Sequence, residues 1–332
     1  MRKVGAVVIG RNEGQRLIDC LKSLRGLELP VVYVDSGSSD GSRDAARELG
    51  ADLVELDLSA PFTAARARNV GFQRLCQAHP EIEFVQFIDG DCVLDSGWLA
   101  SALACVETEP TLAVVCGRRR ERRPDASIFN RLCDLEWDTP VGLADACGGD
   151  ALMRRSAFEA VGGFRDQLIA GEEPELCQRL RKAGSTIRRI DAEMTLHDAA
   201  MDRPGQWLRR AVRAGHAFAE DAWLHRGEGM WRRECRSIWL WGLLLPLVAI
   251  AAAYFTAGVS LLLLLAYPLL VLKIFAAARR RFGARHAALY AVACVAAKFP
   301  QVLGMITYHG NRLRGRRSGL IEYKGPAARH GI

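Results

Sequence analysis

The sequence predicts an α/β domain built on a mostly parallel sheet, followed by an α-helical membrane region. Before residue 230, short Val- and Ile-rich segments alternate with helical stretches, which is the pattern of βαβ units and of parallel strands. Further along, the run 237–272 contains no charged side chain. We therefore expect a first domain over residues 1–225 and a membrane region over residues 226–332.

The strands of the first domain are expected to be short apolar segments bounded by polar residues or glycine. Because ligands of such sheets bind beyond the carboxyl ends of the strands, the polar residues that follow the strands are the candidates for function. The expected strands are 4–9, 31–35, 52–56, 84–89 and 112–116, and the expected helices between them are 15–24, 42–49, 62–77 and 96–107.

The uncharged run is too long for a single membrane span. As one helix it would measure about 54 Å at a rise of 1.5 Å per residue, whereas the hydrocarbon core is roughly 30 Å thick. A break at 256–258 gives two spans, 237–256 and 259–278, with aromatic side chains such as Trp239 and Tyr254 near their ends. Arginines precede and follow the pair, so both flanks are expected on the cytoplasmic side and the helices form a hairpin. The alternative is a buried hairpin in the core of a soluble protein.

A third apolar segment, 287–308, is long enough to span but is expected to lie in the membrane interface. Lys298 and Pro300 fall near its middle, where a charge costs roughly 2.5–3.5 kcal/mol and a proline removes a helix hydrogen bond. Four arginines follow, and a third crossing would place them outside. We predict an interfacial helix bent at Pro300, a cytoplasmic C-terminus, and a multi-pass protein of the inner (cytoplasmic) membrane with a cytosolic first domain.

The distribution of charge and cysteine excludes other classes of protein. Residues 237–332 hold 12 Lys and Arg against one Glu, which leaves a net −4 on the first 236 residues of a chain of net charge +7. A nucleic-acid binder would spread basic residues over its folded domain, so we expect membrane lipids as partners and no nucleic acid. The ten cysteines are scattered without a CxxC pair, which argues against a zinc site or a disulfide framework and favours a reducing compartment.

The fourth expected strand ends in two carboxylates, Asp89 and Asp91, with only Gly90 between them. These carboxylates either cap the following helix or hold a cation. Capping fits Asp95 better, because Asp95 directly precedes Ser96, where the next helix is expected to begin.

Polar segments also follow the first two strands, "GRNEG" (10–14) and "DSGSSDGS" (35–42). Asp35 could accept hydrogen bonds from a base or a ribose, although the second segment is also simply a good turn. Neither the G-x-G-x-x-G nor the G-x-x-x-x-G-K-[ST] phosphate-binding fingerprint is present.

Six motifs in one order resemble the inverting glycosyltransferases of family 2, which have the Rossmann-like GT-A fold. The resemblance covers roughly residues 4–220 and points to a membrane-anchored bacterial type. It implies transfer of a sugar from a nucleotide-diphosphate sugar, a UDP-sugar being favoured, to an acceptor hydroxyl. The motifs are "VVIGRNEGQRLIDCLKSL" (7–24), "VDSGSSDGS" (34–42), "ARARNVGF" (65–72), "FIDGDCVLDSGWL" (87–99), "GGDALMRRSAFEAVGGF" (148–164) and "GEEPELCQRLRKAG" (171–184).

The resemblance implies a Mg²⁺ or Mn²⁺ ion that neutralises the leaving diphosphate as a Lewis acid. Such ions bind a few carboxylates together with phosphate oxygens and water. Asp91 is then the expected direct ligand, and Asp89 contacts the ribose or a metal-bound water. His197, which follows a short apolar stretch, is the expected further contact to the metal or phosphate, although a lone histidine is often structural.

The resemblance also implies a general base, which deprotonates the acceptor hydroxyl. Glu173 matches this place, with Glu172 as the alternative and Pro174 expected at the first position of the helix. The family usually has Glu-Asp here, so the acceptor would sit slightly further back. The alternative is that both acids merely stabilise the helix dipole.

The remaining implied contacts concern the donor and the acceptor. A polyprenyl-type or other lipid-linked acceptor, in polysaccharide or glycolipid biosynthesis, fits a membrane hairpin behind a cytosolic domain. The motif "QWLRRAVRAGHAF" (206–218) has its tryptophan before its arginines, which argues against polymerising activity. A nucleotidyltransferase of similar fold and a non-catalytic membrane scaffold remain the alternatives. Expected nucleotide-sugar contacts are Asn12, Glu13, Asp35, Asp40, Arg66, Arg68, Asn69 and Asp89, and expected acceptor contacts are Asp150, Trp207 and Arg210.

Overall fold

In the computed structural model, which describes residues 3–322, the chain divides into two compact units. Among these residues the first unit comprises 3–124 and 136–200, and the second comprises 125–135 and 201–322. This division differs from the expected boundary near residue 225, because α8 (Pro204–Leu224) belongs to the second unit.

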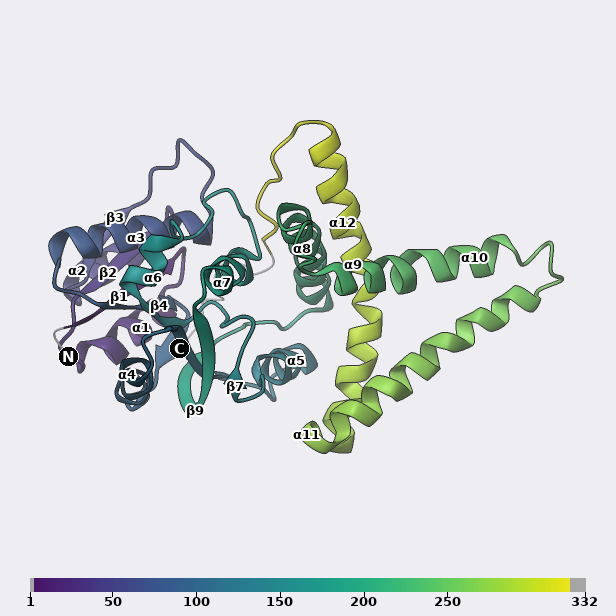
Figure 1. The fold of residues 1–332 in the computed structure, drawn as a ribbon, viewed down its shortest axis with the longest axis horizontal. Coiled ribbons are helices and arrows are strands. Elements are labelled where there is room, and N and C mark those ends of the chain that lie inside the picture. The colour runs from purple at the N-terminus through teal and green to yellow at the C-terminus, as the bar shows by residue number, and fades with distance from the viewer. Residues whose placement is uncertain (1–2, 323–332) are drawn as a thin grey trace. The chain divides into compact units, whose positions relative to one another are not determined.

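The first unit is built on one mixed, largely parallel sheet covered by helices (Figure 1). Its strand order is β3-β2-β1-β4-β8-β6-β9-β5, with β7 paired to β9. The strands are β1 Val4–Gly10, β2 Val31–Asp35, β3 Asp52–Glu55, β4 Phe84–Asp89, β5 Cys92–Leu94, β6 Leu112–Glu121, β7 Gly142–Leu143, β8 Ala151–Arg154 and β9 Thr186–His197.

The five strands and four helices expected from the sequence are all present, and all but the strands 31–35 and 84–89 have shifted ends. The strand expected at 112–116 continues to Glu121, and the helix expected from Ser96 begins at Trp98. Asp95 accepts a hydrogen bond from the Gly97 amide at 2.8 Å just before that helix. The helices of this part of the chain are α1 Gln15–Arg25, α2 Ser42–Glu48, α3 Ala64–Ala78, α4 Trp98–Thr108, α5 Ile128–Trp137, α6 Arg155–Ala160 and α7 Glu172–Lys182.

Two strands that periodicity did not predict complete the sheet next to the acidic turn. β8 runs antiparallel between β4 and β6, so the residue before it, Asp150, lies beside the end of β4. β9 pairs parallel with β6 and antiparallel with β5, in a register that places His197 opposite Cys92. These long-range pairings bring the C-terminal part of the first unit to the carboxyl ends of β1, β2 and β4.

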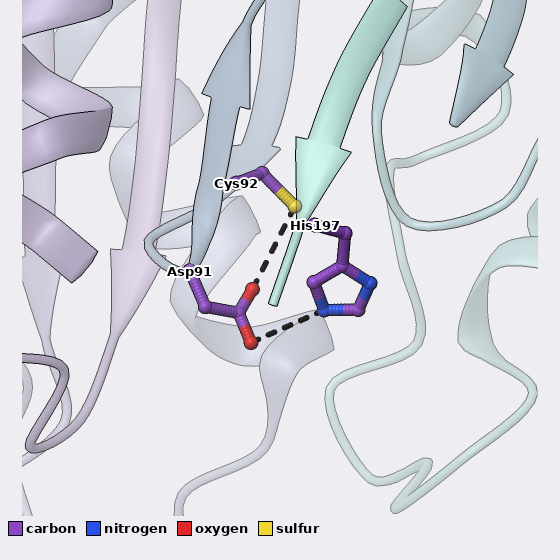
Figure 2. Close-up of side chains that lie close together, drawn as sticks. All are labelled: Asp91, Cys92 and His197. Carbon is purple, nitrogen blue, oxygen red and sulfur yellow. Dashed lines mark hydrogen bonds and ion pairs between the residues drawn. The ribbon is translucent and has the colours of Figure 1, made fainter. Parts of the chain in front are cut away.

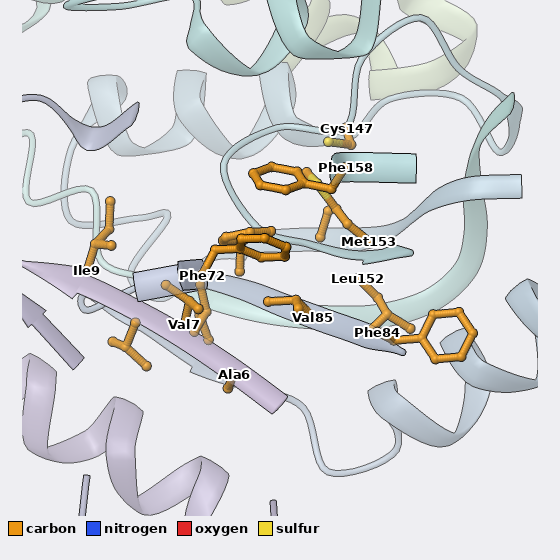
Figure 3. Close-up of a cluster of buried hydrophobic side chains, with 14 of the residues drawn as sticks. Ala6, Val7, Ile9, Phe72, Phe84, Val85, Cys147, Leu152, Met153 and Phe158 are labelled. Carbon is orange, nitrogen blue, oxygen red and sulfur yellow. The ribbon is translucent and has the colours of Figure 1, made fainter. Parts of the chain in front are cut away.

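The core of the first unit fills the space between sheet and helices with apolar side chains (Figure 3). α3 approaches β1 so closely that a Cβ atom at Gly71 would lie 2.5 Å from Val7 Cγ1, which only glycine avoids. Beside this contact, the ring centroids of Phe72 and Phe158 are 4.5 Å apart. The packing fixes the edge of the sheet on which the polar residues gather.

The second unit contains a helical hairpin (Figure 1). Many of the apolar side chains of this hairpin are exposed. Two stretches of the described chain, Arg232–Ala251 and Val259–Leu313, are long and apolar enough to cross a membrane. Within the most apolar 18-residue stretch of each, only 11% and 6% are buried. A hairpin in the core of a soluble protein would be mostly buried. The elements are α9 Arg232–Trp239, the π-helix η1 Leu240–Leu244, α10 Leu245–Ala251, the 3₁₀-helix η2 Val259–Leu265, α11 Ala266–Ala296 and α12 Lys298–Leu313.

The break between the hairpin helices includes the expected 256–258, but the first helix ends earlier than expected, at Ala251. Ala257 and Gly258 have positive φ values of 48° and 87°. Across the hairpin, Ser260 Oγ donates to the Ala249 carbonyl at 2.7 Å, and the Tyr267 hydroxyl donates to the Trp241 carbonyl at 2.5 Å. The later residue of the second helix, Tyr267, contacts the earlier residue of the first, Trp241, so the two helices run antiparallel.

The third apolar segment, 287–308, is helical, but the expected bend at Pro300 is absent, and the chain bends before this segment instead. The backbone leaves helical geometry at Gly283, with φ 73° and ψ 164°, whereas Pro300 is the third residue of α12. A proline in the first helical turn removes no intrahelical bond, so Pro300 causes no break there. α12 packs closely on α8, because a Cβ atom at Gly304 would lie 2.0 Å from the Val212 carbonyl oxygen.

Candidate functional site

The acidic turn after β4 meets the end of β9 in a buried cluster of three potential ligands (Figure 2). Asp91 Oδ2 lies 3.2 Å from His197 Nε2, and the Cys92 thiol lies 3.6 Å from Asp91 Oδ1. The ring of Trp137 packs 4.5 Å from the imidazole, centroid to centroid. From the sequence, Asp91 was expected as a metal ligand and His197 as a further contact to the metal or phosphate, and the fold places these two side chains in contact.

The donor atoms of this cluster fit a small divalent cation. Two neighbouring ligands of an octahedral ion, each about 2.1 Å from it, are about 3.0 Å apart. The 3.2 Å between Asp91 Oδ2 and His197 Nε2 is close to that spacing. A carboxylate and an imidazole suit Mn²⁺, and they also suit Mg²⁺ when water and phosphate supply most of the other ligands. The adjacent thiol of Cys92 would suit a softer ion.

Asp89 belongs to a second cluster that centres on a buried arginine. Arg68 Nη2 donates to Asp89 Oδ1 at 2.6 Å, and its Nη1 donates to Glu172 Oε1 at 2.8 Å. Burial is the largest influence on the pKa of Asp89 and would raise it, but the attraction of Arg68 and other cations outweighs burial, so the pKa is lowered. Asp89 is therefore held ionised and oriented beside Asp91.

Asp150 holds the backbone of the acidic turn at Asp89 in place. It is fully buried, and its Oδ1 accepts a hydrogen bond from the Asp89 amide at 3.0 Å. Its Oδ2 accepts from Thr195 Oγ1 at 2.9 Å and lies 3.1 Å from Arg119 Nη2. Sequence reasoning expected Asp150 at the acceptor and missed Arg119, whose signal is the charged continuation "GRRRE" of the β6 segment.

The two acids expected as base alternatives point to different surroundings. Glu172 is engaged by Arg68, whereas Glu173 Oε1 accepts hydrogen bonds from the Cys147 amide and from the Cys177 thiol, the latter at 3.0 Å. Burial raises the pKa of Glu173 above its ordinary value, although these hydrogen bonds oppose it. α7 begins at Glu172, so Pro174 occupies its third position and not the expected first.

The loops after β1 and β2 lie together at the same edge of the sheet. Asp35 accepts hydrogen bonds from the Gly37 and Ser38 amides at 3.0 and 2.8 Å, which shapes the turn after β2. Asn12 Oδ1 accepts from the Ser39 amide at 2.8 Å and joins the two loops. In the same loops, Glu13 pairs with Arg16 at 2.7 Å and Asp40 accepts from Ser42 Oγ at 2.6 Å.

The remaining residues expected from the sequence come from both units. Arg66 donates to the Ala60 carbonyl at 3.0 Å, and Asn69 donates to the Phe164 carbonyl at 2.7 Å, both from α3. Trp207 and Arg210 are in α8 of the second unit, where the Trp207 ring lies 6.2 Å from that of Phe129. The roles assigned to these residues from the sequence stay predictions.

Comparison with known proteins identifies a family that part of the chain matches. Residues 6–162 match "Glycosyl transferase family 2". The chain is 29% identical over 228 residues to a pre-mycofactocin glycosyltransferase of Mycobacterium tuberculosis, covering 65% of this chain and 47% of that protein. It is 24% identical over 212 residues to the O-antigen chain rhamnosyltransferase WbaN of Salmonella anatum, covering 60% and 65%.

Among solved structures, a mannosyltransferase of Pyrobaculum calidifontis, in complex with GDP-Man and Mn²⁺, superimposes with a TM-score of 0.58 at 20% identity. The match covers 90% of this chain and 87% of that one, and it supports the GT-A fold. The chain spans about half to two thirds of the length of the curated relatives just named.

Proposed function

We propose that this chain, whose residues 6–162 match the family 2 glycosyltransferases, transfers a sugar from a nucleotide-diphosphate sugar to a lipid-linked acceptor, with inversion at the anomeric carbon. The observation that carries the proposal is the contact of Asp91 with His197 at 3.2 Å, at the end of β4 and β9 and beside Asp89. A buried carboxylate–imidazole pair of this spacing at the carboxyl edge of the sheet suits a diphosphate-bound ion.

In this proposal Asp91 and His197 hold Mg²⁺ or Mn²⁺, and Asp89 accepts a hydrogen bond from the donor ribose. The ion would supply Lewis-acid stabilisation of the leaving diphosphate. Arg68 keeps Asp89 ionised and in place. The loops that carry Asn12 and Asp35 border the same edge and would bind the nucleotide, a uridine nucleotide before a guanosine nucleotide.

Glu173 is the proposed general base, with Glu172 as the alternative. A base needs a pKa high enough to accept the acceptor's proton, and burial raises that of Glu173. Glu172 is already held by Arg68 Nη1 at 2.8 Å, so its carboxylate is less free to approach an acceptor hydroxyl. Attack from the face opposite the diphosphate would invert the anomeric carbon.

The proposed acceptor is a lipid-linked saccharide of a polysaccharide or glycolipid pathway. The exposed apolar hairpin supports a multi-pass protein in the inner membrane with the first unit in the cytosol. The related rhamnosyltransferase of Salmonella acts on the O-antigen chain. On α12, Leu303 and Ile306 are exposed while Val302 and Met305 are buried, as suits a helix lying in an interface.

The test is a screen of the full-length protein in detergent against UDP- and GDP-sugars with Mn²⁺ or Mg²⁺, scoring release of the nucleoside diphosphate and transfer to polyprenyl-phosphate or -diphosphate acceptors. Release that needs the metal and yields a product of inverted configuration supports the proposal. Release of pyrophosphate from a nucleoside triphosphate and sugar phosphate would instead indicate a nucleotidyltransferase. If no donor is turned over, the remaining interpretation is that the protein is a non-catalytic membrane scaffold.

A further inference from the structure

Three buried side chains of the first unit lie close together, one from the loop before β8 and two from α7. Cys147 comes from the loop before β8, and Glu173 and Cys177 lie four residues apart on one face of α7. The two sulfur atoms are 3.7 Å apart, and the Cys177 sulfur is 3.0 Å from Glu173 Oε1. One ligand atom from each residue lies within 4.8 Å of the others.

The sulfur spacing is that of a tetrahedral thiolate site. Two thiolates that each bind a tetrahedral Zn²⁺ at about 2.3 Å have sulfur atoms about 3.8 Å apart. A carboxylate oxygen about 2.1 Å from the same ion would lie about 3.6 Å from each sulfur. The sulfur pair already has the required separation. The distance between Glu173 Oε1 and the Cys177 sulfur, now 3.0 Å, would lengthen by about half an ångström.

The chemistry of the cluster separates it from the Asp91–His197 cluster. Thiolates select Zn²⁺ and similar soft ions, whereas Mg²⁺ requires oxygen ligands. Burial raises the pKa of a third thiol, Cys116 of β6, and the charges of Glu173 and Cys177 add to this effect. Cys177 is completely buried, but Cys147 and Glu173 retain 9% and 8% exposure, so an ion would enter from their side.

We propose that Cys147, Glu173 and Cys177 form a second metal site, which binds Zn²⁺ or a similar thiophilic divalent ion in preference to Mg²⁺. Binding exchanges the two thiol protons for the ion and releases both protons to solvent, while the Glu173 carboxylate becomes the third ligand. An occupied site would withhold Glu173 from the acceptor. That consequence, unlike the site itself, rests on the proposed function.

The test measures metal binding directly in the reduced full-length protein, after chelation and in the presence of saturating Mg²⁺. The variant is C147S/C177S, and the matched control is C76S/C105S, which removes two thiols far from the cluster along the chain. Wild type and control should retain one more equivalent of Zn²⁺ than C147S/C177S. Any Zn²⁺ held at Asp91, Cys92 and His197 is common to all three proteins and cancels in this difference.

Cobalt gives a second, independent measurement. Co²⁺ should produce a thiolate-to-metal charge-transfer band of two-thiolate intensity in wild type and control, and lose that intensity in C147S/C177S. Equal Zn²⁺ retention in all three proteins, or a wild-type Co²⁺ spectrum without the two-thiolate band, overturns the site. A Cys147–Cys177 disulfide that persists after fresh reduction overturns it as well.

If C147S/C177S fails to fold, E173Q keeps both thiols and replaces the test. For E173Q we expect weaker binding, with a Zn²⁺ dissociation constant at least tenfold higher than that of wild type. An unchanged dissociation constant counts against the site. Activity is a separate arm: Zn²⁺ should inhibit the control more than C147S/C177S. An inactive protein that still binds Zn²⁺ as described refutes the proposed function and leaves the site standing.

Discussion

Replacing Arg68 by alanine should destabilise the first unit far more than an ordinary loss of an arginine. The guanidinium is 3% exposed and holds Asp89 at 2.6 Å and Glu172 at 2.8 Å. Without it two carboxylates remain close together with no shared cation. A matched control exists on the same helix, because Arg74 Nε contacts Asp52 Oδ2 at the same 2.6 Å on the surface, with side chains 50% and 36% exposed.

The expected magnitude follows from burial. Removing one partner of a buried ion pair costs about 3–5 kcal/mol, and an exposed pair is worth about 0–1 kcal/mol. Asp89 is 29% and Glu172 12% exposed, so water compensates part of the loss. We expect about 2–4 kcal/mol for Arg68→Ala and at most about 1 kcal/mol for Arg74→Ala.

Thermal unfolding of the detergent-solubilised chain, followed by tryptophan fluorescence, measures this difference. Trp98 is fully buried in the first unit and reports on it. A loss of about 2–4 kcal/mol corresponds to a fall in Tm of roughly 5–15 °C for a unit of this size. Adding Asp89→Asn and Glu172→Gln to Arg68→Ala should restore part of the Tm. Equal falls for the Arg68 and Arg74 variants would refute the reasoning.

Three further predictions test the proposed site and topology. Asp91→Ala should abolish sugar transfer while the fold remains intact, with a larger loss than Asp89→Ala; wild-type turnover by the Asp91 variant in excess EDTA would contradict the metal assignment. Glu173→Gln should retain donor binding but lose turnover, because only proton abstraction is removed, and a greater loss for Glu172→Gln would move the base by one residue. A single reporter cysteine at Ser318, in a chain cleared of its native cysteines, should escape a membrane-impermeant thiol reagent in intact cells; labelling would indicate three crossings.

The sequence determined the features that depend on neighbouring residues. Short runs such as "VGAVVI" and "FVQFID" have the composition of buried strands, and the structure has strands there. The uncharged run had to break, and Ala257 and Gly258 adopt a positive φ directly before the second hairpin helix begins at Val259. The acidic turn at Asp89 and Asp91 was visible as two charges at a strand end. Each signal arises from side-chain periodicity or backbone preference within one turn or strand.

The tertiary structure decided which of these local features meet. His197 reaches Asp91 because β9 pairs with β5 in one register, and a shift by one residue would turn its side chain to the other face. Arg119 and Asp150 meet because β8 inserts between β4 and β6. Cysteines with no CxxC spacing become neighbours, as Cys147 and Cys177 do at 3.7 Å. Pairing over such sequence separations depends on the packing of the whole sheet, and no local pattern of residues encodes it.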